Sequence, residues 1–458
     1  MFTTVELPIW ALILIGLLAA VTAASHLLFP SVRWFFRRRA ERVVARLNEK
    51  LTRPIQPFKL ARRHDMIQNV LYDPDVIRAV NDYAEKEGIP DNVAFETAQR
   101  YAREIVPSFS ASLYFGFGIK VARWLARGFY RVRLFNLNRA ELDVIDDNAT
   151  IVFIINHRSN MDYVLVTYLA AGDSALSYAV GEWARSWPLR PIIKMMGGYF
   201  IRRKSLNPLY RKVLARYGQL STREGVAQAV FPEGGLSRSG ALGEPKLGLI
   251  SYIIDGFDAS TARDVVFVPV GINYDRVLED RVLIAAANGR VGSRFKFRMS
   301  TVFRYFGRHI FQRITGSFHR LGYAGVSFGR PVSLRDFIKG RDGDIATQLG
   351  DHLMTQVGDA VPILPVPLVA KHLVALNGGA VSKTELVEAV VSDVQISKGR
   401  GLEVCFPQAG IQKGVDEAII MLQARGLLED DGQNLTVTSR SPELLDYYAA
   451  SLSHFDAT

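Results

Sequence analysis

Between about residues 136 and 335, short apolar runs of strand length alternate with longer helical patterns, and this alternation restricts the fold more than any other feature. Helical patterns such as MDYVLVTYLAAG and NPLYRKVLARYGQLSTRE separate the apolar runs. Buried strands joined by helices are typical of a largely parallel sheet. The sequence therefore predicts an α/β core, a mostly parallel sheet flanked by helices. Its expected strands are TIVFII (150–155), VAQAVF (226–231), VVFVPVGI (265–272) and AGVSFG (324–329).

The stretch LPIWALILIGLLAAVTAASHLLF, residues 7–29, is long enough to cross a bilayer, since about 1.5 Å per residue gives roughly 34 Å. A cleaved signal peptide is the alternative, but Glu6 precedes the stretch and no lysine or arginine does. Basic flanks stay in the cytoplasm, so we expect a single-pass anchor with its N-terminus outside and the rest inside. The flanking arginines are Arg33, Arg37, Arg38, Arg39, Arg42 and Arg46.

The remaining segments divide the chain into further regions. Residues 109–135 mix bulky aromatic and basic side chains without an acidic one, which suits either a membrane interface or a helix packed on the core. Towards the end, Ser382 and Glu385 form a capping-box pattern, and EDDGQNLTVTS resembles the hairpin of a winged helix. We expect an anchor at 1–32, a helical membrane-interface region at 33–135, the α/β core at 136–345 and a helical C-terminal domain at 346–458.

The charge balance indicates an anionic partner. The formal net charge is +11 and the isoelectric point is about 9.6. Residues 290–320 interleave basic and aromatic side chains and contain no acid. Nucleic-acid binding uses the same mixture, but an anchored chain favours anionic membrane lipids; a docking patch for an acidic carrier protein and an insertion packed on the core are the alternatives. Cys405 is the single cysteine, which excludes an internal disulfide.

The stretch INHRSNMDYV, residues 155–164, places a histidine and an aspartate five positions apart directly after a predicted strand. Ser159 and Asp162 resemble a capping box, so we expect the helix to begin at Asn160. With His157 in the loop and Asp162 in the first turn, the imidazole can fold back onto the carboxylate, as in a base with its orienting acid. The alternative is that Asp162 only caps the helix.

Three further motifs carry donors suited to phosphate. MGGYFIRR (196–203) combines Gly197 and Gly198 with two arginines, Arg202 and Arg203. VFPEGGLSRSG (230–240) forms a glycine-rich turn with Ser237 and Arg238, and Lys246 follows it. It lacks the last glycine of a G-x-S-x-G nucleophile elbow, which argues against a serine hydrolase. VFVPVGINYD (266–275) carries Pro269, which predicts an edge strand or a bulge. Each motif alone is also compatible with an ordinary loop or strand end.

Taken together, NHRSNMD, GGYFIRR, FPEGGLSRSG and VPVGI resemble the four ordered motifs of the glycerolipid acyltransferase superfamily. HRSNMDYVLVTY and EGGLSRSG followed by PKLGLIS are most similar to the bacterial and mitochondrial-type glycerol-3-phosphate 1-O-acyltransferases. The resemblance covers roughly residues 109–335. Leu236 stands where that branch usually has an arginine, and FPEG is also similar to the 1-acylglycerol-3-phosphate acyltransferases.

The resemblance implies acyl transfer from an acyl thioester, either acyl-CoA or acyl-acyl carrier protein, to the sn-1 hydroxyl of glycerol-3-phosphate at the bacterial inner membrane. His157 would be the general base and Asp162 its orienting residue, with no covalent intermediate, cofactor, metal or nucleic acid. Lysophosphatidic acid as acceptor is one alternative, and a non-catalytic lipid-binding or scaffold protein is another. The expected substrate-binding residues are Arg158, Ser159, Asn160, Gly198, Arg202, Arg203, Glu233, Gly234, Gly235, Ser237, Arg238 and Lys246.

Overall fold

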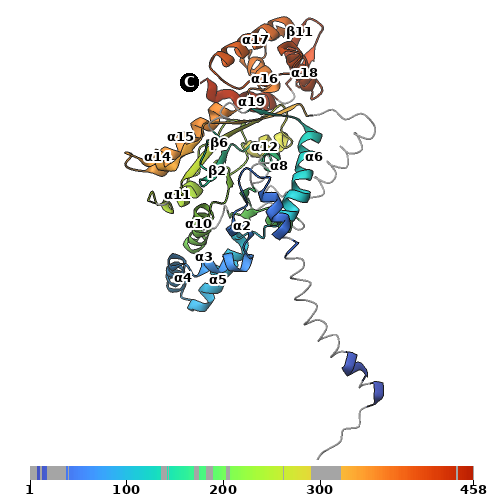
Figure 1. Cartoon of the computed structure of the whole chain (residues 1–458). Coiled ribbons are helices and arrows are strands. Elements are labelled where there is room, and N and C mark those ends of the chain that lie inside the picture. Colours follow the sequence, from blue (N-terminus) through green and yellow to red (C-terminus); the bar gives the residue numbers. More distant parts are fainter. Residues whose placement is uncertain are drawn as a thin grey trace, which may run out of the picture. The chain divides into compact units, whose positions relative to one another are not determined.

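The computed structural model separates the chain into two compact units, residues 1–55 and 56–458. Figure 1 shows the ribbon, in which the sheet strands β2 (Thr150–Ile155) and β6 (Val265–Tyr274) lie at the centre of the second unit. The structure describes residues 8–10, 13–17, 38–39, 41–135, 142, 144–169, 175–181, 189–202, 207–260, 263–289, 321–439 and 442–456.

Most of the predicted anchor, residues 7–29, lies outside the described residues, as does the basic segment 290–320. Within the part of the chain that the structure describes, no helix has the length and apolar character needed to span a membrane. In the first unit, residues 41–48 are helical.

An eight-stranded sheet forms the centre of the second unit, in the order β1-β7-β6-β2-β5-β3-β4, with β8 on the flank of β6. All pairs are parallel except β6 with β7 and β6 with β8. The mostly parallel sheet predicted from the apolar runs is confirmed, and each of the four runs contains a strand. The strands are β1 Arg131–Phe135, β2 Thr150–Ile155, β3 Ser177–Val180, β4 Gly198–Phe200, β5 Gln228–Val230, β6 Val265–Tyr274, β7 Tyr323–Phe328 and β8 Val332–Ser333.

β6 is an interior strand, so the edge-strand alternative predicted from Pro269 is wrong. The register of β6 with its partners shifts by one residue at Pro269, between the pair of Phe267 with Val332 and the pair of Val270 with Phe328, as the bulge alternative requires. On one side β6 pairs with β2 along residues 265–270. On the other side it pairs with β7 from Val270 onwards and with β8 at Val266 and Phe267. Pro269 lies where the partner changes, so its missing N–H interrupts neither ladder.

Helices cover both faces of the sheet (Figure 1). The early helices bury their apolar faces on α10 (Pro208–Arg223), around Val70, Ala98 and Val213. The region predicted as helical, 33–135, also contains β1, which belongs to the main sheet, so the sheet begins before the predicted boundary at 136. The helices up to the end of the sheet are α2 Pro57–Leu60, α3 Arg63–Leu71, α4 Pro74–Glu87, α5 Asp91–Ile105, a π-helix at Ser112–Gly118, α6 Ile119–Phe129, α8 Met161–Leu169, α9 Leu189–Met195, α10 Pro208–Arg223, α11 Gly248–Asp255, α12 Asp280–Ala287 and α14 Leu334–Ile338.

The C-terminal region combines helices with a three-stranded antiparallel sheet of order β10-β11-β9. The capping box at Ser382 and Glu385 is present, and the expected hairpin is β10 with β11. The region shares one hydrophobic cluster with the main sheet, in which Leu445 and Tyr448 join Ile272 of β6. Its elements are α15 Ile345–Ala360, α16 Pro365–Ala375, β9 Ala380–Ser382, α17 Lys383–Gly399, α18 Ile411–Gln423, β10 Leu428–Asp430, β11 Asn434–Val437, α19 Pro442–Ala449 and the 3-10 helix η4 Ala450–Phe455.

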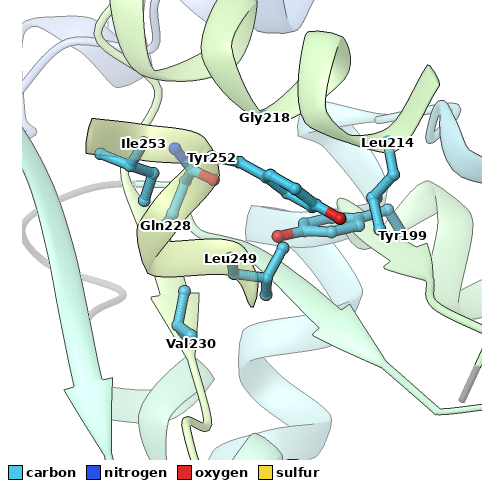
Figure 2. Close-up of a pocket in the computed structure, with 8 residues that line it drawn as sticks. All are labelled: Tyr199, Leu214, Gly218, Gln228, Val230, Leu249, Tyr252 and Ile253. Carbon is cyan, nitrogen blue, oxygen red and sulfur yellow. The ribbon is translucent and has the colours of Figure 1, made fainter. Parts of the chain in front are cut away.

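A small apolar cavity lies between α10, α11 and the strands β4 and β5, as Figure 2 shows. Gly218 of α10 borders it, and a methyl group added at this glycine would meet no atom within 4 Å. A glycine inside a helix lowers stability relative to alanine because it has more conformational freedom to lose on folding. The cavity is lined by Tyr199, Leu214, Gly218, Gln228, Val230, Leu249, Tyr252 and Ile253.

We therefore expect Gly218→Ala to raise the free energy of unfolding by about 0.5–1 kcal/mol, through helix propensity and partial filling of the cavity. The matched control is Gly414→Ala in α18, where the new Cβ would lie 2.4 Å from Cδ1 of Phe406. That variant should be less stable than wild type. Urea denaturation measures both changes, and equal effects of the two substitutions would contradict this account.

Candidate active site

The strand β2 and the helix α8 are joined by residues 156–160, and this loop carries the predicted histidine. Nδ1 of His157 lies 2.9 Å from Oδ2 of Asp162, and the two side chains are 2% and 0% exposed. The helix begins at Met161, one residue after the predicted start. The predicted contact between a loop histidine and a first-turn aspartate is confirmed.

The carboxylate of Asp162 accepts three more hydrogen bonds. The backbone N–H groups of Arg158 and Ser159 donate to Oδ2 over 2.7 and 3.0 Å. The Tyr274 hydroxyl, at the end of β6, donates to Oδ1 over 2.5 Å. Burial and the neighbouring Asp162 charge raise the pKa of Tyr274 well above its usual value, so the phenol keeps its proton and remains a donor. Asp162 is thus both the acidic residue of a capping-box arrangement at the start of the helix and the partner of His157.

Two other polar side chains hold the loop in place. Nδ2 of Asn156 donates to the backbone oxygen of Ile272, and the N–H of Ile272 donates back to Oδ1 of Asn156. Glu279 accepts from the Ser159 hydroxyl over 2.8 Å and from the side-chain amide of Asn160 over 3.0 Å. Ser159 and Asn160, predicted to bind substrate, therefore have their side chains bound to the carboxylate of Glu279, a half-buried residue.

The glycine-rich turn after β5 is connected to the same loop. The backbone N–H of His157 donates to Oε1 of Glu233 over 2.7 Å, and the N–H of Gly243 donates to Oε2 over 3.0 Å. Burial raises the pKa of Glu233 above its usual value, although these N–H donors oppose the shift. The N–H of Ser237 donates to the backbone oxygen of His157, and its hydroxyl donates to that of Ala241. Glu233 and Ser237 thus join the two loops.

Exposed cations lie on this turn. Gly234 has a φ of 67°, and a Cβ at this position would lie 2.7 Å from Cδ of Lys246, so the lysine stem crosses the turn. Lys246 and Arg238 are exposed, and Gly235 is half-buried. These two cations are available to an anionic ligand at the surface of the turn.

The predicted role of Arg158 in binding substrate does not fit its surroundings. The residue is 3% exposed. Its Nη1 donates to the backbone oxygen of Gly240, and its guanidinium carbon lies 5.3 Å from the centre of the Tyr447 ring. The side chain therefore points into the packing between the glycine-rich loop and α19.

The second motif is only partly described. A Cβ at Gly198 would lie 2.6 Å from Cγ2 of Ile193, so this close approach requires glycine. Arg202 forms a bidentate ion pair with Glu104 of α5 and stacks on Tyr101. The guanidinium that was predicted to bind phosphate is therefore already paired with a carboxylate. Arg203 lies outside the described residues.

Sequence reasoning missed four residues that position this site, namely Tyr274, Glu279, Asn156 and Glu104. For Tyr274 the sequence carried a signal. Residues two apart in a strand share one face, so Tyr274 lies on the same face as Val270 and Ile272, after Pro269. Glu279 and Glu104 have no local signal, because their partners are about a hundred residues distant.

The arrangement can remove a proton from a hydroxyl group. Asp162 holds Nδ1 of His157, which leaves Nε2 as the proton acceptor and stabilises the imidazolium that forms. The aromatic ring of Phe231 lies 4.3 Å from the imidazole, between ring centres, and makes the surroundings apolar. Among the described residues, no group of three histidine, cysteine or acidic side chains is arranged to hold a metal ion.

Two family models match the chain. Residues 136–273 match the Acyltransferase family, and residues 310–455 match the Glycerol-3-phosphate acyltransferase C-terminal region. The first match contains both His157 and Asp162, and the second contains α15 to α19.

Curated relatives extend over most of the chain. It is 28% identical over 422 residues to the glycerol-3-phosphate acyltransferase of Pseudomonas aeruginosa strain UCBPP-PA14, which is 86% of this chain and 49% of the relative. It is 26% identical over 460 residues to that of Shewanella amazonensis, which is 94% of this chain and 53% of the relative. The chain spans about half the length of the curated relatives it matches.

A crystal structure of the 1-acyl-sn-glycerophosphate acyltransferase from Thermotoga maritima aligns with a TM-score of 0.32 at 16% identity. The alignment covers 53% of this chain and 76% of the other.

Four hydrogen-bond donors converge on the carboxylate of Asp162. We therefore expect Asp162→Asn to lower the free energy of unfolding by about 2 kcal/mol or more. An amide has one acceptor oxygen, so part of the donor set would be left buried and unpaired. The control is Asp351→Asn on the exposed side of α15, which should stay within about 0.5 kcal/mol of wild type. Urea denaturation at neutral pH measures both, and a stability loss no larger than that of the control would contradict the account.

Proposed function

We infer that this chain, which belongs to the glycerolipid acyltransferase superfamily, transfers a fatty acyl group from an acyl thioester to the sn-1 hydroxyl of glycerol-3-phosphate and produces lysophosphatidic acid. The observation that carries the proposal is the buried contact between His157 and Asp162 within the segment that matches the Acyltransferase family. The match to the Glycerol-3-phosphate acyltransferase C-terminal region and the names of the relatives support glycerol-3-phosphate as acceptor.

In the proposed reaction, Nε2 of His157 takes the proton of the acceptor hydroxyl as its oxygen attacks the thioester carbonyl. The new C–O bond forms a tetrahedral intermediate. Its collapse breaks the C–S bond, and the imidazolium returns the proton to the leaving thiolate. Asp162 stabilises the imidazolium and keeps the ring oriented through Nδ1. The acceptor itself is the nucleophile, so no covalent enzyme intermediate, metal or cofactor enters the proposal.

The acceptor phosphate would be bound by the exposed cations beside this loop. Lys246 crosses the Gly234 turn, and that turn belongs to the loop whose Glu233 accepts from the His157 N–H. Arg238 is exposed on the same loop, and Arg203 is the other candidate. Arg202 is assigned a supporting role, since its guanidinium already holds Glu104.

The decisive experiment gives the purified full chain a labelled acyl thioester with glycerol-3-phosphate, with its 1-acyl form, or with no acceptor. We expect transfer to glycerol-3-phosphate, and His157→Ala should lose nearly all of it, about 10³-fold or more. If the chain prefers the 1-acyl form, that form and not glycerol-3-phosphate is the acceptor. No transfer to either acceptor would leave lipid binding without catalysis as the remaining function. Full activity of His157→Ala would overturn the role of His157 as the general base.

Replacing Lys246 should affect the binding of the acceptor rather than the chemical step. We expect Lys246→Ala to raise KM for glycerol-3-phosphate about tenfold with little change in kcat, since a phosphate contact made equally in ground and transition states is lost. Lys398→Ala, an exposed lysine of α17, is the control and should change neither constant. If the two variants have the same KM, Lys246 does not bind the phosphate.

We also propose that the chain is anchored in a membrane by residues 7–29, with the enzyme unit on the cytoplasmic side. The apolar length and the arginines that follow support the anchor. The π-helix at Ser112–Gly118 and α6, which follows it, support contact with anionic lipids. Phe117 of the first and Trp124 of the second are 58% and 52% exposed, and Lys120, Arg123 and Arg127 are exposed basic side chains of α6. Such a surface would hold the site at the bilayer, into which a lipid product partitions.

A nitroxide label at Trp124→Cys tests this surface in a Cys405→Ser background. On reconstitution into vesicles with anionic lipid, the label should become more accessible to oxygen and less accessible to a polar nickel complex, since oxygen concentrates in the acyl region. The control label replaces Tyr72, which is exposed at the end of α3. Equal accessibility changes at both labels would exclude a specific role for α6 in membrane contact.

A further inference from the structure

Arg158 is a buried cation that lies against an aromatic ring and has few hydrogen-bond partners. It is 3% exposed, and only Nη1 has a hydrogen-bond partner among the described residues, the backbone oxygen of Gly240. Nε and Nη2 have none in that part of the chain. A buried guanidinium without water is costly, and a π face beneath it offsets part of that cost. Tyr447 of α19 supplies this face, 5.3 Å from the guanidinium carbon.

The same residue belongs to the proton-transfer pair through its backbone. The N–H of Arg158 donates to Oδ2 of Asp162, and the preceding residue is His157. A displacement of the Arg158 side chain would therefore move a donor to Asp162 and the peptide next to the imidazole. The side chain and the backbone of one residue connect α19 to the acid–base pair.

The backbone of α19 also approaches the glycine-rich loop closely. A Cβ at Gly240 would lie 1.9 Å from the backbone oxygen of Tyr447, so only glycine fits here, and its φ of 91° also favours glycine. Gly240 is the residue whose carbonyl accepts from Arg158. The ring and the backbone of Tyr447 thus contact both loops that carry the site.

A second contact from the C-terminal region reaches the other side of the loop. The Tyr448 hydroxyl donates to Asp280 over 2.5 Å, and Arg425 pairs with the same carboxylate over 2.7 Å. Asp280 follows Glu279, which accepts from Ser159 and Asn160. Neighbouring residues of α19 therefore stabilise both ends of the segment 158–160.

From these contacts we propose that Tyr447 is a positioning residue, through which the C-terminal region holds the loop of His157 in its reactive geometry. The proposal rests on the acyl transfer proposed above. It assigns to the C-terminal region a part in the chemical step, exerted through Arg158, in addition to its contribution to the hydrophobic core. The Tyr447 hydroxyl has no partner among the described residues, so the ring and not the hydroxyl carries this role.

Three variants separate positioning from stability. Tyr447→Leu removes the π face, Tyr447→Phe keeps it, and Leu445→Ala removes buried apolar surface from the same helix, about 200° around its axis. Rates are compared for equal amounts of folded protein. Tyr447→Leu should then lower kcat by about tenfold or more with a smaller change in KM, because a misplaced base slows the chemical step. Tyr447→Phe and Leu445→Ala should retain kcat within about twofold.

A measurement without substrate keeps this inference separate from the proposed function. Diethyl pyrocarbonate modifies accessible histidines, and peptide mapping follows His157, which is 2% exposed, on its own. Its modification rate should rise in Tyr447→Leu and stay unchanged in the other two variants. Equal rates and equal kcat in Tyr447→Leu and Leu445→Ala would overturn the inference. If the wild type transfers no acyl group, the proposed function fails, while the modification rates still decide whether Tyr447 holds the loop.

Discussion

The buried carboxylate of Asp162 is the interaction on which the site depends. A charge removed from water must be compensated by hydrogen bonds, and here the donors are the His157 ring, two backbone N–H groups and the Tyr274 hydroxyl. These donors come from the loop after β2 and from the end of β6. The parallel pairing of β2 with β6, from Thr150 with Val265 to Ile155 with Val270, brings them together. The sheet thereby sets the geometry of the acid–base pair.

The helix-capping and catalytic interpretations of Asp162 turn out to describe one arrangement. The side chain accepts from the N–H groups that precede the helix, as the acidic residue of a capping box does, and the same oxygen holds Nδ1 of His157. The cap keeps His157 in the loop, and that position is what makes the contact possible. A helix that began earlier would have turned the two side chains about 140° apart.

The C-terminal region belongs to the same core as the sheet. Glycines make the approach possible where backbones meet: a Cβ at Gly271 of β6 would lie 2.3 Å from the carbonyl carbon of Ala360, and Gly240 faces Tyr447 in the same way. The segment matched by the second family model therefore packs directly on the strand that supplies Tyr274. This packing gives a physical reason for the segment that matches the Acyltransferase family and the C-terminal segment to occur in one folded unit.

The sequence by itself determined the features that depend on near neighbours: the four apolar strands, the His157–Asp162 contact, the glycine-rich turn and the capping box at Ser382. Periodicity and capping act over a few residues, so a single chain displays them directly. Only the tertiary structure decided the partners of Glu279 and Arg202, the burial of Arg158 and the interior position of β6. Each of these features brings together groups that lie far apart in the chain. Their contact follows from strand order and helix packing, which local patterns do not encode, and so predicted ligands proved to be supports of the site.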